Sequence, residues 1–353
     1  RPLFPTPHPS MAVVRDRRPQ LNLTLELPLR DSVATAAAAG RRFQLVPPPA
    51  PPAAAAAACS EHRLADFERI QVLGHGNGGT VYKVRHRRTG SVYALKLLHP
   101  HDQSDPALRR QIYREIEILR RTDSPHVVRC HSILQSTSSA GDYPLLLEYM
   151  DAGTLESLLR RHRRLPEAAL AGVARQVLQG IAYLHSQKIV HRDIKPSNLL
   201  LGHGGEIKIS DFGVSKVMTR SLDPCDSYVG TCAYMSPERF DPGTHGGSYD
   251  AYAGDVWSLG LTVLELYLGH FPLLPEGQRP DWATLMCAIC FGEQPSLPDS
   301  ASEELKGFVD CCLQRDANKR WTVEQLLAHP FVTRDQTESA LALQKLLREP
   351  SAR

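Results

Sequence analysis

The chain has 353 residues, which is enough for one large domain or two modest ones. Its composition, 42% hydrophobic and 22% charged, is ordinary for a globular protein and excludes a fibrous or wholly disordered chain. The formal net charge of +3 is too small to favour nucleic acid or an anionic membrane, so neither is expected as a partner.

The eight cysteines are scattered and form no short disulfide framework, which fits a cytoplasmic or nuclear protein with reduced thiols. Cys287 and Cys290 lie one turn apart in a predicted helix, and we expect them to be buried small hydrophobic residues, not zinc ligands. The most apolar helical run, residues 256–268, is shorter than the ~20 residues of a membrane-spanning helix.

Residues 1–60 do not read as a folded domain. They contain proline clusters and two alanine runs with few aromatic residues, a composition that buries too little apolar surface to offset chain entropy. We expect a disordered N-terminal arm, a folded domain over residues 67–331 and a C-terminal tail over residues 332–353.

The folded region changes its periodicity part-way along the chain. Alternating patterns separated by glycine turns predict strands over residues 67–73, 80–84 and 92–97. Helical spacing of apolar residues then predicts helices over residues 109–121, 170–185, 255–268 and 305–313. Strands first and helices afterwards indicate a small sheet-rich lobe followed by a larger helical lobe.

A glycine cluster, GHGNGGTV at residues 74–81, lies between the first two predicted strands. Glycines let the backbone approach phosphate closely enough for amide N–H groups to bind it. A dinucleotide-binding turn would lead into a helix, whereas residues 80–82 continue as a strand, which favours a phosphate-covering hairpin. The candidate phosphate-binding residues are Leu73, Gly74, His75, Gly76, Asn77, Gly78, Gly79, Thr80 and Val81.

Lys96 lies on the third predicted strand, where a half-buried ammonium needs a charged partner. Nucleotide phosphates and a helix carboxylate would both stabilise it. Glu115, on the predicted helix 109–121, is the chosen partner, with Glu117 as the alternative.

The strongest signal is HRDIKPSN at residues 191–198, followed by Asp211 at the start of a DFG triplet. The two match the catalytic and metal-binding loops of phosphoryl-transfer enzymes. Asp193 is expected to accept the proton of a substrate hydroxyl, with Lys195 beside it. Asn198 and Asp211 would bind Mg²⁺, because amide and carboxylate oxygens suit that cation.

Over residues 67–331 the sequence resembles the protein kinase family. Glu238 ends an SPE triplet where the family has APE, and Arg320 would pair with it. The resemblance implies ATP and Mg²⁺ as cofactors, with Glu148 and Met150 in the adenine-facing hinge beside the gatekeeper position, Leu147. It also implies the α+β bilobal kinase fold: a small antiparallel-sheet lobe with one main helix (about residues 67–147) and a larger, mainly helical lobe (about 151–331).

Within that family the chain is most similar to the MAP kinase kinases, which phosphorylate both Thr and Tyr. Ser197 in the catalytic loop and the S-x5-S spacing of Ser221 and Ser227 resemble the plant type. Ser221 and Ser227 are therefore expected to be activation phosphosites, with Arg192 as the receiver of the phosphate charge.

Basic residues precede alternating leucines at residues 15–25 of the arm, a pattern that suits docking of an extended peptide on a partner. In MAP kinase kinases such a stretch binds the downstream MAP kinase. The candidate docking residues are Arg15, Arg17, Arg18, Leu21 and Leu23. The expected partners are that MAP kinase and an upstream MAP kinase kinase kinase. The alternatives are a serine/threonine kinase of another signalling tier and a non-catalytic scaffold.

The leucines of the C-terminal tail leave two interpretations open. Leu341, Leu343, Leu346 and Leu347 either contact an upstream kinase or pack on the large lobe.

Overall fold

The computed structural model describes residues 62–76, 79–99, 106–135, 142–212, 232–240, 250–275 and 281–349. The predicted arm, the proposed docking residues within it and the two candidate phosphosites lie outside these ranges. Asn77 and Gly78 of the glycine cluster lie outside them as well.

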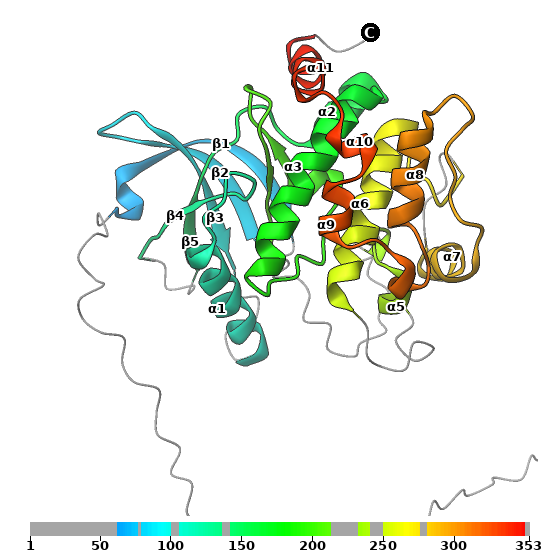
Figure 1. Ribbon diagram of the computed structural model, residues 1–353. Coiled ribbons are helices and arrows are strands. Elements are labelled where there is room, and N and C mark those ends of the chain that lie inside the picture. Colours follow the sequence, from blue (N-terminus) through cyan, green and yellow to red (C-terminus); the bar gives the residue numbers. More distant parts are fainter. Residues whose placement is uncertain are drawn as a thin grey trace, which may run out of the picture. The chain divides into compact units, whose positions relative to one another are not determined.

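The small lobe is a five-stranded antiparallel sheet in the order β1-β2-β3-β5-β4. Its strands are β1 (Phe67–Gly76), β2 (Gly79–His86), β3 (Val92–Leu98), β4 (Cys130–Ile133) and β5 (Tyr143–Leu147). One long helix, α1 (Pro106–Arg121), lies beside the sheet (Figure 1). It buries Ile112, Ile116 and Leu119, the residues that gave the helical spacing in the sequence. The predicted antiparallel sheet with one main helix is confirmed.

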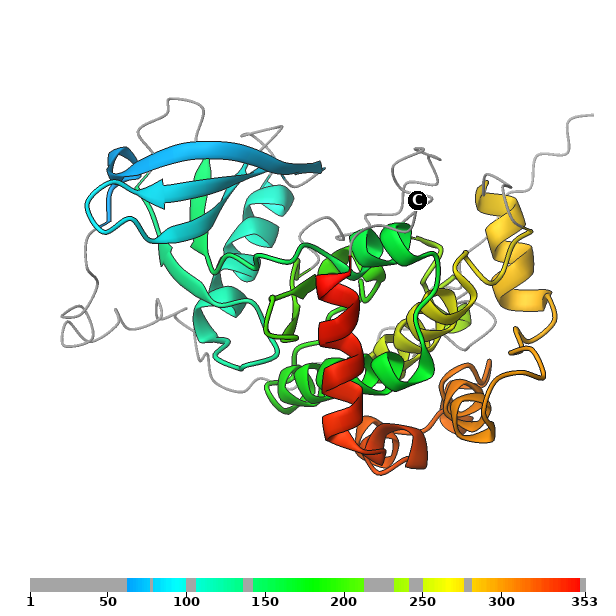
Figure 2. The same ribbon diagram turned by 90° about the horizontal axis from the view of Figure 1, so that it is seen from above.

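The large lobe is mainly helical and follows the sheet in sequence (Figures 1 and 2). Its longest helices, α3 (Glu167–Ser186) and α6 (Ala251–Leu268), pack against each other at the centre of the main core. Around them are α2 (Leu155–His162), α5 (Pro237–Phe240), α7 (Trp282–Met286), α8 (Glu303–Cys312), α9 (Val323–Leu327), α10 (Pro330–Thr333) and α11 (Gln336–Arg348). A two-stranded hairpin of β6 (Leu199–Leu201) and β7 (Ile207–Ile209) carries the residues that follow the catalytic loop.

Helix α6 begins four residues before its predicted start. Asp250 caps it, because its carboxylate accepts a hydrogen bond from the Tyr252 N–H at 2.8 Å. Gly269 ends the helix with φ of +93°, a conformation that glycine adopts without steric cost. Thirteen of the eighteen residues of α6 are buried, and the helix packs on α3 and α8.

Helix α11 decides between the two interpretations of the tail. It runs across α3 and α2 (Figure 2), and its Ser339 packs so closely that a Cβ on Gly172 would lie 3.3 Å away. Leu343, Leu346 and Leu347 are buried, whereas Leu341 is 60% exposed. The tail leucines therefore pack mainly on the large lobe.

The expectation for the paired cysteines is wrong in part. Cys287 is exposed and Cys290 half-buried. Residues 282–291 bury Leu285 and Ile289, which are one turn apart, and Cys287 lies midway between them and therefore on the opposite side. Among the described residues, no three His, Cys, Asp or Glu side chains gather closely enough to hold a metal ion.

None of the helices in the described part of the chain is both long enough and apolar enough to cross a bilayer.

Candidate active site

A cleft of about 560 Å³ separates the sheet from the large lobe. Seven of the predicted nucleotide-binding residues line it: Leu73, Gly74, Val81, Lys96, Glu115, Glu148 and Met150. The predicted metal ligands Asn198 and Asp211 line it too. His75, Gly76, Gly79 and Thr80 belong to the hairpin above the cleft but are not part of its lining.

The glycine hairpin is formed by β1 and β2, whose last register pair is Gly76 with Gly79. His75 Nδ1 and Thr80 Oγ1 lie 3.2 Å apart across the two strands, so a side-chain hydrogen bond also links the ends of the hairpin. Gly79 has φ of +134°, and a Cβ there would lie 1.8 Å from the carbonyl oxygen of Leu97. Only glycine fits at this position, so Gly79 is required by the packing of β2 against β3 and not only by an approach to phosphate.

Lys96 is buried on β3 and lies between two carboxylates. Its Nζ is 2.7 Å from Asp211 Oδ1 and 3.4 Å from Glu115 Oε1. Glu117, the alternative partner, instead forms an exposed ion pair with Arg121. Burial lowers the pKa of Lys96, but Asp211 and Glu115 outweigh it and raise the pKa well above its usual range. The ammonium is therefore permanently charged and draws helix α1 and the DFG segment together.

The charge of Lys96 also acts on its partners. It is the main cause that holds the pKa of the Asp211 carboxyl below its ordinary value, so Asp211 is ionised at neutral pH. Burial raises the pKa of Glu115 despite the nearby ammonium. Asp211 is half-exposed to the cleft and has φ of +62°, an uncommon backbone conformation for a non-glycine residue.

Asp193 is held by two neighbours in the catalytic loop. Asn198 donates from Nδ2 to the Asp193 carboxylate at 3.0 Å and to its backbone oxygen at 2.8 Å. Lys195 Nζ lies 3.2 Å from the same carboxylate. The structure thus brings the three predicted catalytic residues into one cluster, with the Asp193 side chain fixed in place.

Asp255, at the core of α6, fixes the backbone of this loop. Its buried carboxylate accepts the N–H groups of His191 at 2.9 Å and Arg192 at 2.8 Å, and lies 2.9 Å from His185 Nε2. Burial raises the pKa of Asp255, but these hydrogen bonds outweigh it and keep the pKa below its ordinary value. An ionised acceptor beneath the loop can hold Arg192 at φ of +68°, immediately before Asp193.

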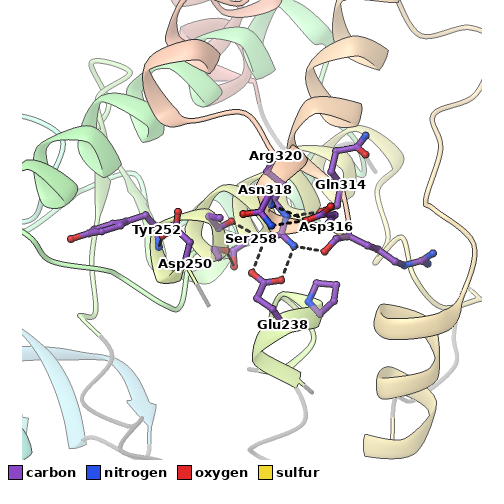
Figure 3. A network of polar contacts seen from close by, with 12 residues as sticks. Glu238, Asp250, Tyr252, Ser258, Gln314, Asp316, Asn318 and Arg320 are labelled. Atoms are coloured by element: carbon purple, nitrogen blue, oxygen red, sulfur yellow. Dashed lines mark hydrogen bonds and ion pairs between the residues drawn. The ribbon is translucent and has the colours of Figure 1, made fainter. Parts of the chain in front are cut away.

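Glu238 and Arg320 form the predicted pair (Figure 3), and both side chains are fully buried. The contact is bidentate, with nitrogen–oxygen distances of 2.6 and 2.7 Å. Arg320 also donates to the carbonyl oxygens of residues 253, 314 and 315 and lies over the ring of Trp257. Because all its donors are used, Arg320 joins α5, α6 and the segment after α8.

Sequence reasoning missed several residues of the cleft. Ala94 lies two positions before Lys96 on β3, and Leu200 lies two positions after Asn198. A period of two along each strand would have found them, because alternate residues share one face. Val128 gave no such local signal, since it reaches the cleft from the segment before β4. Asp255 lies outside the cleft lining, and its place beneath the catalytic loop came only from the tertiary structure.

Comparison with known proteins agrees with this geometry. The protein kinase domain family matches residues 67–332. Mitogen-activated protein kinase kinase 9 of Arabidopsis thaliana is 57% identical over 325 residues, covering 92% of this chain and 100% of the relative. Mitogen-activated protein kinase kinase 7 of the same plant is 59% identical over 268 residues, covering 76% and 85%. A moss relative, mitogen-activated protein kinase kinase 1c of Physcomitrium patens, is 43% identical over 292 residues, covering 80% and 81%.

The chain is a protein kinase of the MAP kinase kinase family. Its family implies ATP and a divalent metal ion, and the residues of the cleft fit both. The amide nitrogen of Asn198 donates both of its hydrogen bonds to Asp193, so its amide oxygen is the atom available to a cation. Asp211 offers an ionised, half-exposed carboxylate beside it in the cleft lining.

The mechanism of the kinase follows from these positions. When bound, ATP supplies the phosphoryl group. Lys96 presents a fixed positive charge to the cleft that would suit phosphate oxygens, and the glycine hairpin would add backbone N–H donors. The carboxylate of Asp193, the predicted proton acceptor, has the Lys195 ammonium beside it at 3.2 Å, an arrangement that would orient an attacking hydroxyl and offset its charge.

His191 of the kinase carries a neutral ring inside this network. Its Nδ1 accepts the Asp193 N–H at 3.2 Å, and its Nε2 donates to the Ser210 carbonyl oxygen at 3.0 Å. Burial lowers the pKa of His191 below its ordinary value, and the nearby carboxylates of Asp255 and Asp193 only partly offset this. The neutral form is required, because a protonated Nδ1 could not accept the Asp193 N–H.

This requirement predicts a pH dependence of stability. Below a pH of about 6.5, His191 binds a proton in the unfolded chain but stays neutral in the folded protein. The free energy of unfolding therefore falls as the pH falls. The loss is at most about 1.4 kcal/mol per pH unit until the folded pKa is reached. Denaturant unfolding at pH 7.5, 6.5 and 5.5 measures it, and His191→Gln should show a shallower decline. Equal slopes for the two proteins would contradict the assignment.

Proposed function

We propose that the kinase transfers the γ-phosphoryl group of ATP to both the Thr and the Tyr of a MAP kinase activation loop. The observation that carries the proposal is the match to mitogen-activated protein kinase kinase 9 over the whole of that relative. The complete catalytic cluster of Asp193, Lys195 and Asn198 supports an active enzyme over a non-catalytic scaffold. No observation favours a kinase of another tier.

The proposed metal is Mg²⁺. Carboxylate and amide oxygens with one or two protein ligands are typical of Mg²⁺ bound together with nucleotide phosphates. Asn198 and Asp211 are the proposed ligands, which is consistent with their adjacent positions in the cleft lining.

Activation is proposed to follow phosphorylation of Ser221 and Ser227 by an upstream MAP kinase kinase kinase. Each phosphate would add about −1.5 to −2 charges and three acceptor oxygens. Arg192 supports a receiving role, because Asp255 and Arg239 both hold its backbone beside Asp193. Charge pairing at Arg192 would order the segment that leads to the substrate-binding side of the cleft.

Docking of the MAP kinase is proposed to use the arm residues Arg15, Arg17, Arg18, Leu21 and Leu23. The alignment with mitogen-activated protein kinase kinase 9 covers more of the chain than the kinase domain does. Relatedness therefore extends beyond the catalytic residues, which is consistent with a shared function of the flanking segments.

A panel assay tests these proposals together. The Ser221→Asp/Ser227→Asp protein is incubated with ATP, Mg²⁺ and a set of MAP kinases, and Thr and Tyr phosphorylation are read by mass spectrometry. We expect both residues to be modified on at least one MAP kinase, with basal activity above that of the unmodified chain. A third protein with Arg15, Arg17 and Arg18 changed to Glu should show a raised KM for that MAP kinase.

Three outcomes would count against the proposals. Modification of Ser or Thr alone would point to a different kinase tier. Full activation of a Ser221→Ala/Ser227→Ala protein by an upstream kinase would refute the phosphosites. An unchanged KM in the arm variant would refute the docking residues.

A further inference from the structure

Glu148, the first hinge residue, does not direct its side chain into the cleft that it lines. Its carboxylate accepts two hydrogen bonds from Lys208 Nζ, at 2.6 and 2.8 Å. The two side chains are only 28% and 15% exposed, so water screens this ion pair less than a surface pair. Lys208 belongs to β7 of the large lobe, whereas Glu148 directly follows β5 of the small lobe.

The pair lies at a junction of three chain segments. The Glu148 N–H donates to the Arg129 carbonyl oxygen at 2.9 Å, and its carboxylate accepts the Arg129 N–H at 3.3 Å. The segment before β4 is also bonded to β7: the Ile209 N–H donates to the His126 carbonyl oxygen, and the Val128 N–H donates to the Ile209 carbonyl oxygen, each at 2.9 Å. The Lys208–Glu148 pair therefore completes a connection between the hinge and the large lobe.

Strand β7 relates this junction to the nucleotide cleft. Lys208 is the register partner of Leu200, which lines the cleft, whereas Ile207 and Ile209 point into the core. Two residues after Ile209 the chain reaches Asp211. A shift of Lys208 would thus move the hinge and the start of the DFG segment together.

The second hinge residue is held from the other lobe. Lys83 of β2 places its Nζ 4.5 Å from the centre of the Tyr149 ring. Consecutive hinge side chains are therefore held by lysines of opposite lobes. With both side chains engaged, the backbone of residues 148–150 is the part of the hinge left to meet a ligand in the cleft.

We propose that Lys208 is a positioning residue for nucleotide binding, acting through the Glu148 carboxylate to orient the hinge backbone against the adenine. A hinge that is already fixed in its binding orientation loses less conformational freedom when the nucleotide binds, so preorganisation favours binding. Removing the ammonium leaves the half-buried Glu148 carboxylate with the weak Arg129 contact alone, so the side chain turns to water and the hinge loosens. The proposal concerns nucleotide binding and holds whichever protein the kinase phosphorylates.

The test is calorimetric titration of the full-length protein with ADP in the presence of Mg²⁺, which requires no protein substrate. Lys208→Met removes the charge, Lys208→Arg keeps it, and Glu148→Gln neutralises its partner. Lys306→Met is the matched control, because Lys306 pairs with Glu303 at 2.9 Å on α8, far along the chain from the hinge. Thermal unfolding of each protein confirms that titrations are made well below its Tm.

We expect Lys208→Met to raise the Kd for ADP about tenfold. Lys208→Arg and Lys306→Met should stay within about twofold of the unmodified chain. In steady state the KM for ATP should rise with Kd while kcat changes little, which a general loss of stability would not produce. The Lys208→Met/Glu148→Gln double variant should bind no worse than Lys208→Met alone, because both changes break one interaction.

Two results would overturn the proposal. One is an unchanged Kd in a folded Lys208→Met protein. The other is additive loss in the double variant, which would mean that Lys208 acts by a route other than Glu148. If Lys208→Met fails to fold, Lys208→Gln with the same titration decides between these outcomes.

Discussion

Replacing Asp193 with Asn is expected to lower kcat by about a hundredfold to ten-thousandfold while the protein stays folded. The Asn side chain has nearly the same shape, so the contacts from Lys195 and Asn198 can be largely retained. An amide cannot accept the proton of the attacking hydroxyl, however, and presents a donor where an acceptor is needed. Single-turnover phosphorylation of the MAP kinase identified by the panel assay measures the loss.

A control for this experiment is Asp310→Asn. Asp310 is an exposed carboxylate on α8 whose side-chain partners in the described part of the chain are Gln294 and Gln314, so activity should stay within about twofold of the unmodified chain. Lys96→Met is the complementary change: it should abolish activity by removing the charge shared by Glu115 and Asp211. Retention of more than about a tenth of kcat by Asp193→Asn would rule out proton acceptance as its main role.

The largest expected effect on stability comes from Arg320. Changing it to Met leaves the Glu238 carboxylate buried without a partner and removes donors from three backbone carbonyls. We expect the free energy of unfolding to fall by about 3–5 kcal/mol, because an uncompensated buried charge is costly. Urea denaturation followed by fluorescence measures the change.

The pair itself is separated from its neighbours by a double variant. Arg320→Met/Glu238→Met should recover part of the loss, because neither charge is then buried alone. Arg160→Met is the matched control: its pair with Glu156 on α2 is exposed, and its loss should cost less than about 0.5 kcal/mol. If Arg320→Met and Arg160→Met destabilise the chain equally, the buried pair does not have the structural role argued here.

Much of the site could be predicted because its candidate residues belong to short motifs that occur in a fixed order along the chain. Gly79, Lys96, Asp193 and Asp211 occupy positions where only one residue type serves the chemistry or the sterics, so spacing along the chain identified them. Glu115 was preferred to Glu117 for its position next to the apolar Ile116, and the structure pairs Glu115 with Lys96 and Glu117 with Arg121.

Other expectations depended on where a segment lies in space. The exposure of Cys287 depends on which side of its helix meets the core, and that side carries Leu285 and Ile289. The position of α11 on α3 depends on the close approach of Ser339 to Gly172, two residues far apart in sequence. Amphipathic leucines showed that α11 had a face to bury but not what would cover it.

By itself, then, the sequence determined the fold class, the kinase family and the candidate residues of the cleft and catalytic loop, because these depend on local spacing and on side-chain chemistry. Only the tertiary structure decided how those residues are held. The carboxylate of Asp255 beneath the catalytic loop, the hydrogen bond from Arg320 to the Ala253 carbonyl and the Lys208–Glu148 pair at the hinge all join segments about 60 or more residues apart. Such contacts arise from the path of the whole chain, and each needs a buried charge to meet its partner in a place that no single segment specifies.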